Sequence, residues 1–162
     1  MKEIVLKDDA LITSKTDLKG FITYANDDFA RYSGYSLKEC LYKNHNIVRH
    51  KDMPKTVFKC LWDYIQEGKE IFAFVKNLAK NGDFYWVFAN VTPSFNDKNE
   101  IINYYSVRRK PNSKAISTVE DLYSILLKEE KNGLESGVNK LLEVVNSYNM
   151  SYNQLMMHLQ EQ

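Results

Sequence analysis

The pattern of apolar and polar residues divides the chain near Pro111. Before this residue, short runs rich in β-branched and aromatic side chains are typical of strands. These runs cover residues 11–17, 20–26, 70–80, 83–93 and 101–109. After Pro111 the apolar residues recur at helical spacing instead. We therefore expect one unit over residues 1–111 and a helical extension over residues 112–162.

Helix signals fall between the second and third of these runs. Asn26 offers a side chain that can cap a helix, and Gly34 can end it. A second short helix is expected after Ser36, whose hydroxyl can form a capping box with Glu39. Residues 54–68 predict a longer helix, with proline near its start, glycine at its end and apolar residues at helical spacing.

The order of these elements predicts the fold class. Two strands are followed by short helices and then by three more strands. The last three strands are separated by "KNGD" (80–83) and "NDKNE" (96–100), whose Asn, Asp and Gly residues are typical of hairpin turns. We therefore predict an α+β fold, in which a five-stranded antiparallel sheet carries short helices on one face.

The C-terminal third carries a separate helical signal. Apolar residues repeat at alternating spacings of four and three, at Leu134, Val138, Leu141, Val145, Tyr148, Tyr152, Leu155 and Leu159. This spacing predicts the seam of a coiled coil or helical bundle from residue 134, through which the chain would form a homo-oligomer or dock on a partner helix. The alternative is that the seam packs on its own sheet or on a helix at 115–131. Gly133 is expected to separate the two C-terminal helices.

Composition narrows the function classes. The chain has 162 residues, with 22 Lys and Arg against 21 Asp and Glu, so a generic nucleic-acid binder is disfavoured. No apolar run approaches the roughly 20 residues that cross a bilayer, so any membrane role is expected to come through a partner. Cys40 and Cys60 form no CxxC pair and no signal peptide is apparent, which indicates a reducing, cytoplasmic location.

Polar and ionisable groups concentrate in "NHNIVRHKDMP" (44–54). Asp52 can cap the helix that follows, and Arg49 can pair with Asp52. His45, His50 and Asp52 form no recognised metal-ligand spacing, so no metal site is predicted. The chain also lacks a nucleophile elbow, a phosphate-binding glycine loop and a paired-carboxylate constellation, so an enzyme is not expected.

Four stretches resemble the sensory PAS domain of bacterial aerotaxis and energy-taxis receptors. They are "ITYANDDFARYSGYSLKEC", "HNIVRHKDMP", "VKNLAKNGDFYWVFANVTP" and "YYSVRRKP", and the resemblance covers roughly residues 10–125. It implies a PAS fold that holds FAD noncovalently and reports redox or energy state to a methyl-accepting chemotaxis receptor. The chain resembles the stand-alone PAS subunit of a two-part receptor of this kind.

The resemblance also implies a set of site residues: Asn26, Arg49, His50, Asp52 and Asn77 match positions associated with flavin binding or sensing. A guanidinium at Arg49 suits the pyrophosphate of FAD. The amides of Asn26 and Asn77 can donate to and accept from the flavin ring. His50 can exchange a hydrogen bond when the charge of the flavin changes.

One departure from the family pattern concerns the aromatic contact to the flavin ring. The family commonly has a tryptophan where this chain has Ile71, so Phe72 or Phe74 is expected to substitute. Trp62 and Trp86 are expected in the core rather than against a cofactor. Neither cysteine lies in a motif like that of light-sensing flavin PAS domains. Two alternatives stay open, a haem-binding gas sensor and a cofactor-free PAS assembly module.

Overall fold

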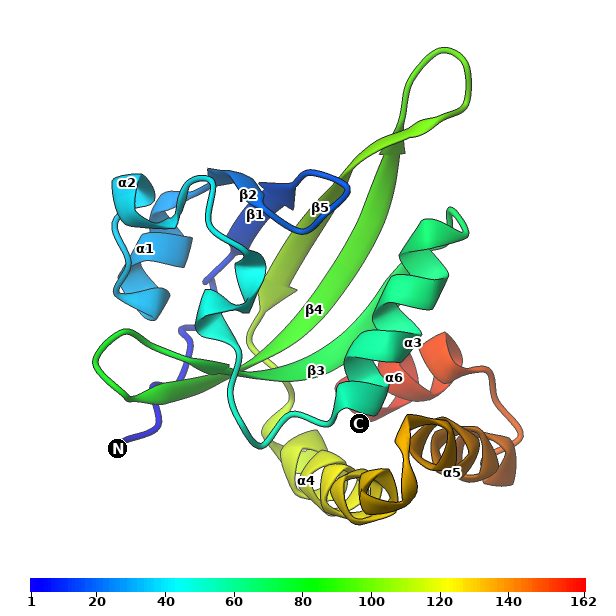
Figure 1. Ribbon diagram of the computed structural model, residues 1–162. Helices are drawn as coiled ribbons and strands as arrows, with labels where there is room; N and C mark the ends of the chain where they lie inside the picture. Colours follow the sequence, from blue (N-terminus) through cyan, green and yellow to red (C-terminus); the bar gives the residue numbers. More distant parts are fainter.

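The computed structural model describes residues 1–162 and is built on a five-stranded antiparallel sheet in the order β2-β1-β5-β4-β3 (Figure 1). The strands are β1 (Ile12–Thr16), β2 (Ile22–Ala25), β3 (Ile71–Leu78), β4 (Phe84–Phe95) and β5 (Ile101–Arg109). The predicted fold class and all five strands are confirmed. The last strand in sequence lies in the middle, where Ser106 of β5 is opposite Ser14 of β1 and Val91 of β4.

Short helices connect β2 to β3, as predicted. They are α1 (Asp27–Ser33), α2 (Leu37–Cys40), the 3-10 helix η1 (His45–Val48) and α3 (Lys55–Gln66). Asn26 caps α1 by accepting from the Phe29 N–H, and Gly34 ends this helix with φ 76°. Ser36 and Glu39 form both hydrogen bonds of the predicted capping box. Local side-chain chemistry therefore fixes where these helices begin and end.

Three further helices and one 3-10 turn follow the sheet. They are α4 (Ser113–Glu129), η2 (Glu130–Asn132), α5 (Leu134–Ser147) and α6 (Tyr152–Glu161). The rings of Trp86 on β4 and Tyr123 on α4 lie 6.1 Å apart, and the Tyr123 hydroxyl donates to the Phe74 carbonyl of β3. The Phe72 N–H of β3 donates to Asn153 of α6 over 2.9 Å. The C-terminal helices therefore cover the outer face of β3 and β4, and share a core with α3.

The apolar seam that begins at residue 134 does not lie on one continuous helix. The helix stops at Ser147, Asn149 adopts φ 53°, and Ser151 starts α6 with a capping box. The seam residues Leu141, Val145, Tyr152, Leu155 and Leu159 are buried in the core of this chain. The alternative, that the apolar stripe covers the chain's own sheet and helices, describes the structure. A heptad spacing and a helix packed on its own domain look alike in sequence, because both require one apolar face.

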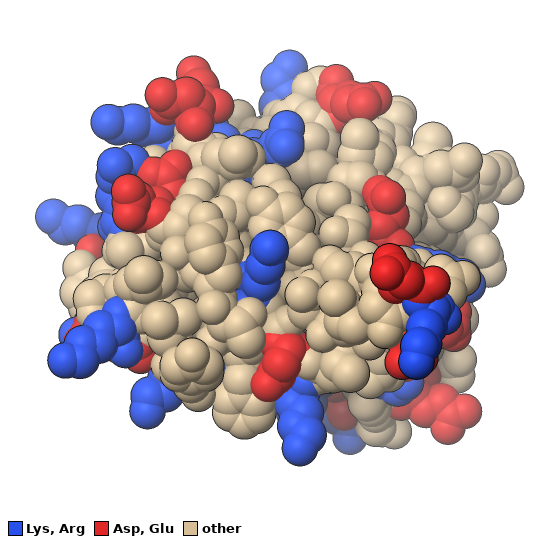
Figure 2. All heavy atoms as spheres, turned by 90° about the horizontal axis from the view of Figure 1, so that it is seen from above, with Lys and Arg blue, Asp and Glu red and all other residues tan.

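No helix in the structure is both long enough and apolar enough to cross a membrane. Charged side chains of both signs lie around the rim of the face seen in Figure 2, and in its middle basic and acidic side chains stand apart among uncharged residues. Thus no single sign of charge dominates this face of the molecule.

A cavity between the sheet, η1 and α3

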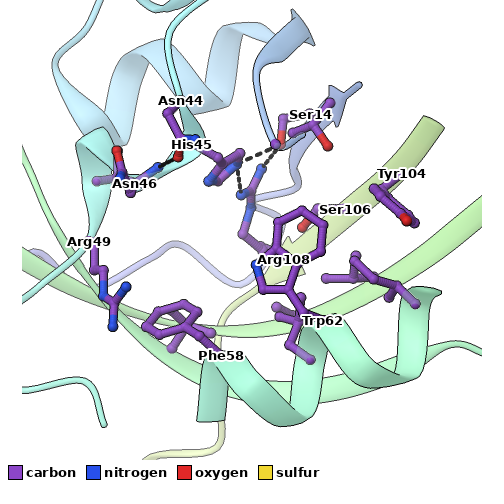
Figure 3. Close-up of a pocket in the computed structure, with 18 of the residues that line it drawn as sticks. Ser14, Asn44, His45, Asn46, Arg49, Phe58, Trp62, Tyr104, Ser106 and Arg108 are labelled. Carbon is purple, nitrogen blue, oxygen red and sulfur yellow. Dashed lines mark hydrogen bonds between the residues drawn. The ribbon is translucent and has the colours of Figure 1, made fainter. Parts of the chain in front are cut away.

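A cavity of about 400 Å³ lies between the inner face of the sheet, the η1 segment and helix α3 (Figure 3). Its size falls in the range of small-molecule and cofactor sites. Side chains reach it from three layers of the fold. Its residues are Ser14, Thr16, Lys19, Gly20, Asn44, His45, Asn46, Val48, Arg49, Phe58, Leu61, Trp62, Ile65, Val75, Asn77, Ala89, Val91, Tyr104, Ser106 and Arg108.

Helix α3 supplies the apolar wall. Phe58, Leu61, Trp62 and Ile65 follow the helical repeat, so they form one face, and this face borders the cavity. The Trp62 indole meets the Tyr104 ring of β5 edge to face, with centroids 5.7 Å apart. The wall and the sheet therefore bound an apolar, aromatic space between them.

The sheet supplies the floor. Alternate residues of a strand share a face, so Tyr104, Ser106 and Arg108 of β5 all point to the cavity. Ser14 joins them from β1 because the register places it opposite Ser106. Asn77 reaches the cavity from β3 and is 5% exposed. The floor therefore combines small residues with a few buried polar groups.

Three side chains form a polar cluster at the buried end of the cavity. The Arg108 guanidinium donates to His45 Nε2 over 2.9 Å and to Ser14 Oγ over 2.6 Å, and Ser14 Oγ lies 3.0 Å from the same His45 nitrogen (Figure 3). Burial and the adjacent Arg108 charge lower the pKa of His45 to about 3. Burial lowers the pKa of Arg108 to about 10. At neutral pH the cluster is thus a charged guanidinium held by two neutral acceptors.

The cavity is electropositive. Its lining contains three cationic side chains, Lys19, Arg49 and Arg108, and no aspartate or glutamate. Lys19 and Arg49 are exposed, whereas Arg108 is 4% exposed. The cavity therefore has a local excess of positive charge, although the net charge of the whole chain is near neutral.

Two of the five predicted site residues line this cavity. Arg49 follows η1, its backbone forms an isolated bridge with Asn77, and its guanidinium lies over the Phe58 ring at 4.1 Å. The alternative pairing of Arg49 with Asp52 is not present, because Asp52 pairs with Lys76 over 2.8 Å. The structure therefore brings Arg49 and Asn77 together and leaves the Arg49 guanidinium without a carboxylate partner.

The other three predicted residues lie outside the cavity lining. Asn26 accepts from the backbone N–H groups of Thr13 and Phe29 and donates to the Leu11 carbonyl, which joins β1 to α1. His50 is 3% exposed, and its Nδ1 accepts from the Asp52 N–H over 3.1 Å. These contacts give Asn26 and His50 structural roles, and a role toward a cofactor stays a prediction.

The 44–54 segment divides between two surroundings. His45 lines the cavity, whereas His50 borders a second, more open depression, which shares Asn46 and Arg49 with the cavity. Burial and the Lys76 charge lower the pKa of His50. The hydrogen bond from Lys76 lowers the pKa of Asp52. No group of three or more His, Cys, Asp or Glu side chains is placed to hold a metal ion.

Sequence reasoning missed Arg108, Ser14 and Trp62 as cavity residues. Arg108 lies in "YYSVRR", where strand alternation places it on the face of Tyr104, but alternation alone does not say which face is inward. Trp62 packs against the core, as expected, and also lines the cavity. The two residues expected to replace the family tryptophan do not line it, because Phe72 and Phe74 both contact Phe88, 5.7 and 4.9 Å away between ring centroids. Ile71 is fully buried.

Two curated proteins align with most of this chain. It is 44% identical over 121 residues to the aerotaxis receptor of Escherichia coli K12, which aligns with 75% of this chain and 24% of the receptor. It is 30% identical over 96 residues to a nitrogen fixation regulatory protein of Klebsiella pneumoniae, over 59% of this chain and 19% of that protein. The chain therefore spans at most about a quarter of these relatives.

Solved structures share the fold. The blue-light photoreceptor Aureochrome1 LOV in its light state superposes with a TM-score of 0.57 at 24% identity, over 74% of this chain and 91% of that one. A PAS domain from Colwellia psychrerythraea superposes with a TM-score of 0.52 at 17% identity, over 62% of this chain and 85% of that one. The family model described as the PAS fold matches residues 22–108, which is more than half of the chain. The match includes the strands and helices around the cavity from β2 to Arg108 of β5. The chain therefore belongs to the PAS family and is related in sequence to the aerotaxis receptor.

Proposed function

We propose that the chain binds FAD in this cavity and acts as a redox or energy sensor. The observation that carries the proposal is the lining itself, which joins an apolar aromatic wall, an amide group and three cations without any carboxylate. FAD combines a flat, largely apolar ring with two phosphate charges. Bound FAD would supply reversible electron uptake, and the residues around it would bind and orient the cofactor and respond to its change of charge.

Each part of the cofactor has suitable residues. Trp62 and Phe58 form one wall for a flat ring, and the Asn77 amide can both donate to and accept from ring atoms. Lys19 and Arg49 are the exposed cations of the lining, which suits a hydrated pyrophosphate. A guanidinium offers paired hydrogen bonds to phosphate oxygens, so Arg49 is the stronger candidate of the two.

The aerotaxis receptor of E. coli supports the redox assignment, because a receptor for aerotaxis responds to oxygen or to its metabolic consequences. The LOV structures support only the fold, at 24% identity or below. Neither Cys40 nor Cys60 lines the cavity, so no thiol is placed to bond to a flavin ring there. We therefore expect a noncovalent flavin whose state changes by electron transfer.

A haem sensor is the second candidate, and His45 is the residue that could serve it. Its Nε2 already accepts from Arg108 and lies 3.0 Å from Ser14 Oγ. An iron bond at that nitrogen would displace the hydrogen bond to the buried guanidinium. The cavity therefore favours flavin over haem.

Signal output is expected through another protein. We propose a methyl-accepting chemotaxis receptor as the partner, a cytoplasmic location, contact with the membrane only through that partner, and no catalytic activity of the chain itself. The relatives named for aerotaxis and for regulation of nitrogen fixation support a signalling role. Because five of the eight seam residues are buried in the core of the chain, an oligomer or receptor contact would use a different surface or require the C-terminal helices to move.

The absorption spectrum of the purified full chain tests the proposal. Flavin bands at a stoichiometry near one, with FAD identified by chromatography after denaturation, are the expected result. A Soret band would support haem, and no absorbing cofactor, even after incubation with FAD, would support the assembly module. Ser106→Leu, which fills the cavity floor, should lower FAD content, whereas Ser117→Leu on the exposed side of α4 should not.

A further inference from the structure

The Arg108 guanidinium is a buried positive charge without a negative partner. Its side chain is 4% exposed, and its Nε is buried without any hydrogen-bond partner. The two groups to which it donates hydrogen bonds, His45 and Ser14, are neutral, and so is the Phe29 ring that it faces at 5.6 Å. Burying an unpaired charge is strongly unfavourable, so buried arginines are normally paired with carboxylates.

No other group of this chain supplies the missing charge. The cavity lining holds no aspartate or glutamate, and none of the ion pairs of the chain includes Arg108. The nearby Tyr85 phenol is neutral at physiological pH, because burial raises its pKa to about 12. The negative charge that would satisfy Arg108 therefore has to enter the cavity with the ligand.

The position of Arg108 indicates which part of the ligand carries that charge. Lys19 and Arg49 are exposed, whereas Arg108 lies at the buried end with its guanidinium 5.6 Å from the Phe29 ring. A flat, largely apolar ring fits these surroundings, and a hydrated pyrophosphate does not. A flavin ring is neutral when oxidised. After uptake of two electrons and one proton it carries one negative charge, which a nearby cation stabilises.

We propose that Arg108 is the counter-ion of the reduced, anionic flavin ring and so makes the cavity bind reduced FAD more tightly than oxidised FAD. This inference rests on the proposed FAD function. Tighter binding of the reduced state raises the midpoint potential of the bound cofactor, so Arg108 would set the redox range over which the sensor switches.

Arg108→Gln tests this role, and Arg109→Gln is its matched control. Arg109 is the next residue of β5, exposed and on the opposite face, so its replacement removes the same charge outside the cavity. The midpoint potential of FAD bound to each full-length variant is measured with electrons supplied by an electrode. We expect the preference of Arg108→Gln for reduced FAD to fall by about 10- to 100-fold. For a two-electron couple, this fall lowers the midpoint potential by about 30 to 60 mV. Arg109→Gln should keep the wild-type potential.

Two results would overturn the inference while leaving FAD binding in place. One is an unchanged potential in Arg108→Gln. The other is an equal loss of affinity for oxidised and reduced FAD, which would place Arg108 against the phosphates, whose charge is the same in both states. A wild-type chain that binds no FAD would instead overturn the proposed function, and this inference with it.

The wild-type chain gives an independent test should Arg108→Gln fail to fold. At mildly acidic pH, where free reduced flavin is neutral, a ring held anionic takes up one proton for two electrons. The midpoint potential should then change by about 30 mV per pH unit, because one proton is taken up for every two electrons. Twice that slope would show a neutral ring and overturn the inference. His45, which faces Arg108 from η1, stays neutral over this range because its pKa is about 3. The other cationic side chains of the lining are Lys19 and Arg49.

Discussion

Glu130 caps helix α3 at Thr56, although 74 residues separate the two. Its carboxylate accepts from the Thr56 N–H over 2.7 Å and from the Thr56 hydroxyl over 2.9 Å. Pro54, at the start of α3, offers no capping side chain. The helix that forms the cavity wall is therefore tied at its first turn to the junction of α4 and α5. A ligand that displaces α3 would therefore also shift or break the Glu130 contacts, and so act on the C-terminal helices.

We predict that Glu130→Ala destabilises the fold by about 1 to 2 kcal/mol, the loss typical of a helix cap with a charged acceptor. Glu135→Ala is the control, because Glu135 is exposed and makes no hydrogen bond or ion pair. The free energy of unfolding in urea measures both. Equal, small effects of the two changes would contradict the capping role.

Gly137 allows α5 to approach this cap. A Cβ at residue 137 would lie 2.2 Å from Thr56 Oγ1 and 3.1 Å from Glu130 Cγ, and Glu130 holds Thr56 in place. We therefore predict that Gly137→Ala lowers stability by about 1 to 3 kcal/mol, as expected for overpacking, despite the higher helix propensity of alanine. In a Thr56→Ala background the penalty should shrink, because the clashing oxygen is gone. A double-mutant cycle of unfolding free energies measures this coupling.

Stability should fall on acidification because His45 is held neutral. Its pKa is about 3 in the folded chain against 6.5 ordinarily, so below pH 6.5 the unfolded chain binds a proton that the folded chain excludes. The free energy of unfolding should therefore decrease by up to about 1.4 kcal/mol per pH unit between pH 6 and pH 4. His50, whose pKa is also lowered, acts in the same direction. His45→Asn should reduce this slope more than the control His158→Asn, a change at an exposed residue of α6.

Local signals predicted the fold correctly, and long-range packing is where sequence reasoning failed. The capping box at Ser36 and the glycine at Gly34 act within a few residues, so the sequence contains their whole cause. Whether Leu155 faces a partner or its own sheet depends on how α6 packs on β3, where Phe72 bonds to Asn153, 81 positions later in the chain. Arg108 was missed for a similar reason, since its burial depends on pairing between β1 and β5. Arg49 and Asn77 could be predicted from a family resemblance, which carries such long-range information.

The buried seam gives a further prediction. Leu155 is 1% exposed, whereas Leu142 on α5 is 54% exposed. Leu155→Asp should therefore destabilise the fold by several kcal/mol, because it places a charge in the core, and Leu142→Asp should change stability by about 0.5 kcal/mol or less. Urea unfolding measures both variants. A stable Leu155→Asp chain whose only change is a lower mass by light scattering would show instead that the seam joins two copies.

The last prediction separates two of the predicted site residues. The Arg49 guanidinium is exposed, pairs with no carboxylate and lies over the Phe58 ring at the cavity. His50 is 3% exposed and holds the turn before α3 through the Asp52 N–H. Arg49→Ala should therefore lower FAD affinity by about 10-fold or more while leaving the free energy of unfolding of the apoprotein within about 0.5 kcal/mol.

His50→Ala should show the opposite pattern, a loss of about 1 to 3 kcal/mol in apoprotein stability because a buried ring and its hydrogen bond are removed. Lys51→Ala, a change at the exposed residue that follows them, is the common control. FAD titration followed by absorbance and urea unfolding of the apoprotein measure the two quantities separately. If His50→Ala instead lowers FAD affinity with no change in apoprotein stability, His50 acts on the cofactor even though it lies outside the cavity lining, and the resemblance would locate the site better than the cavity does.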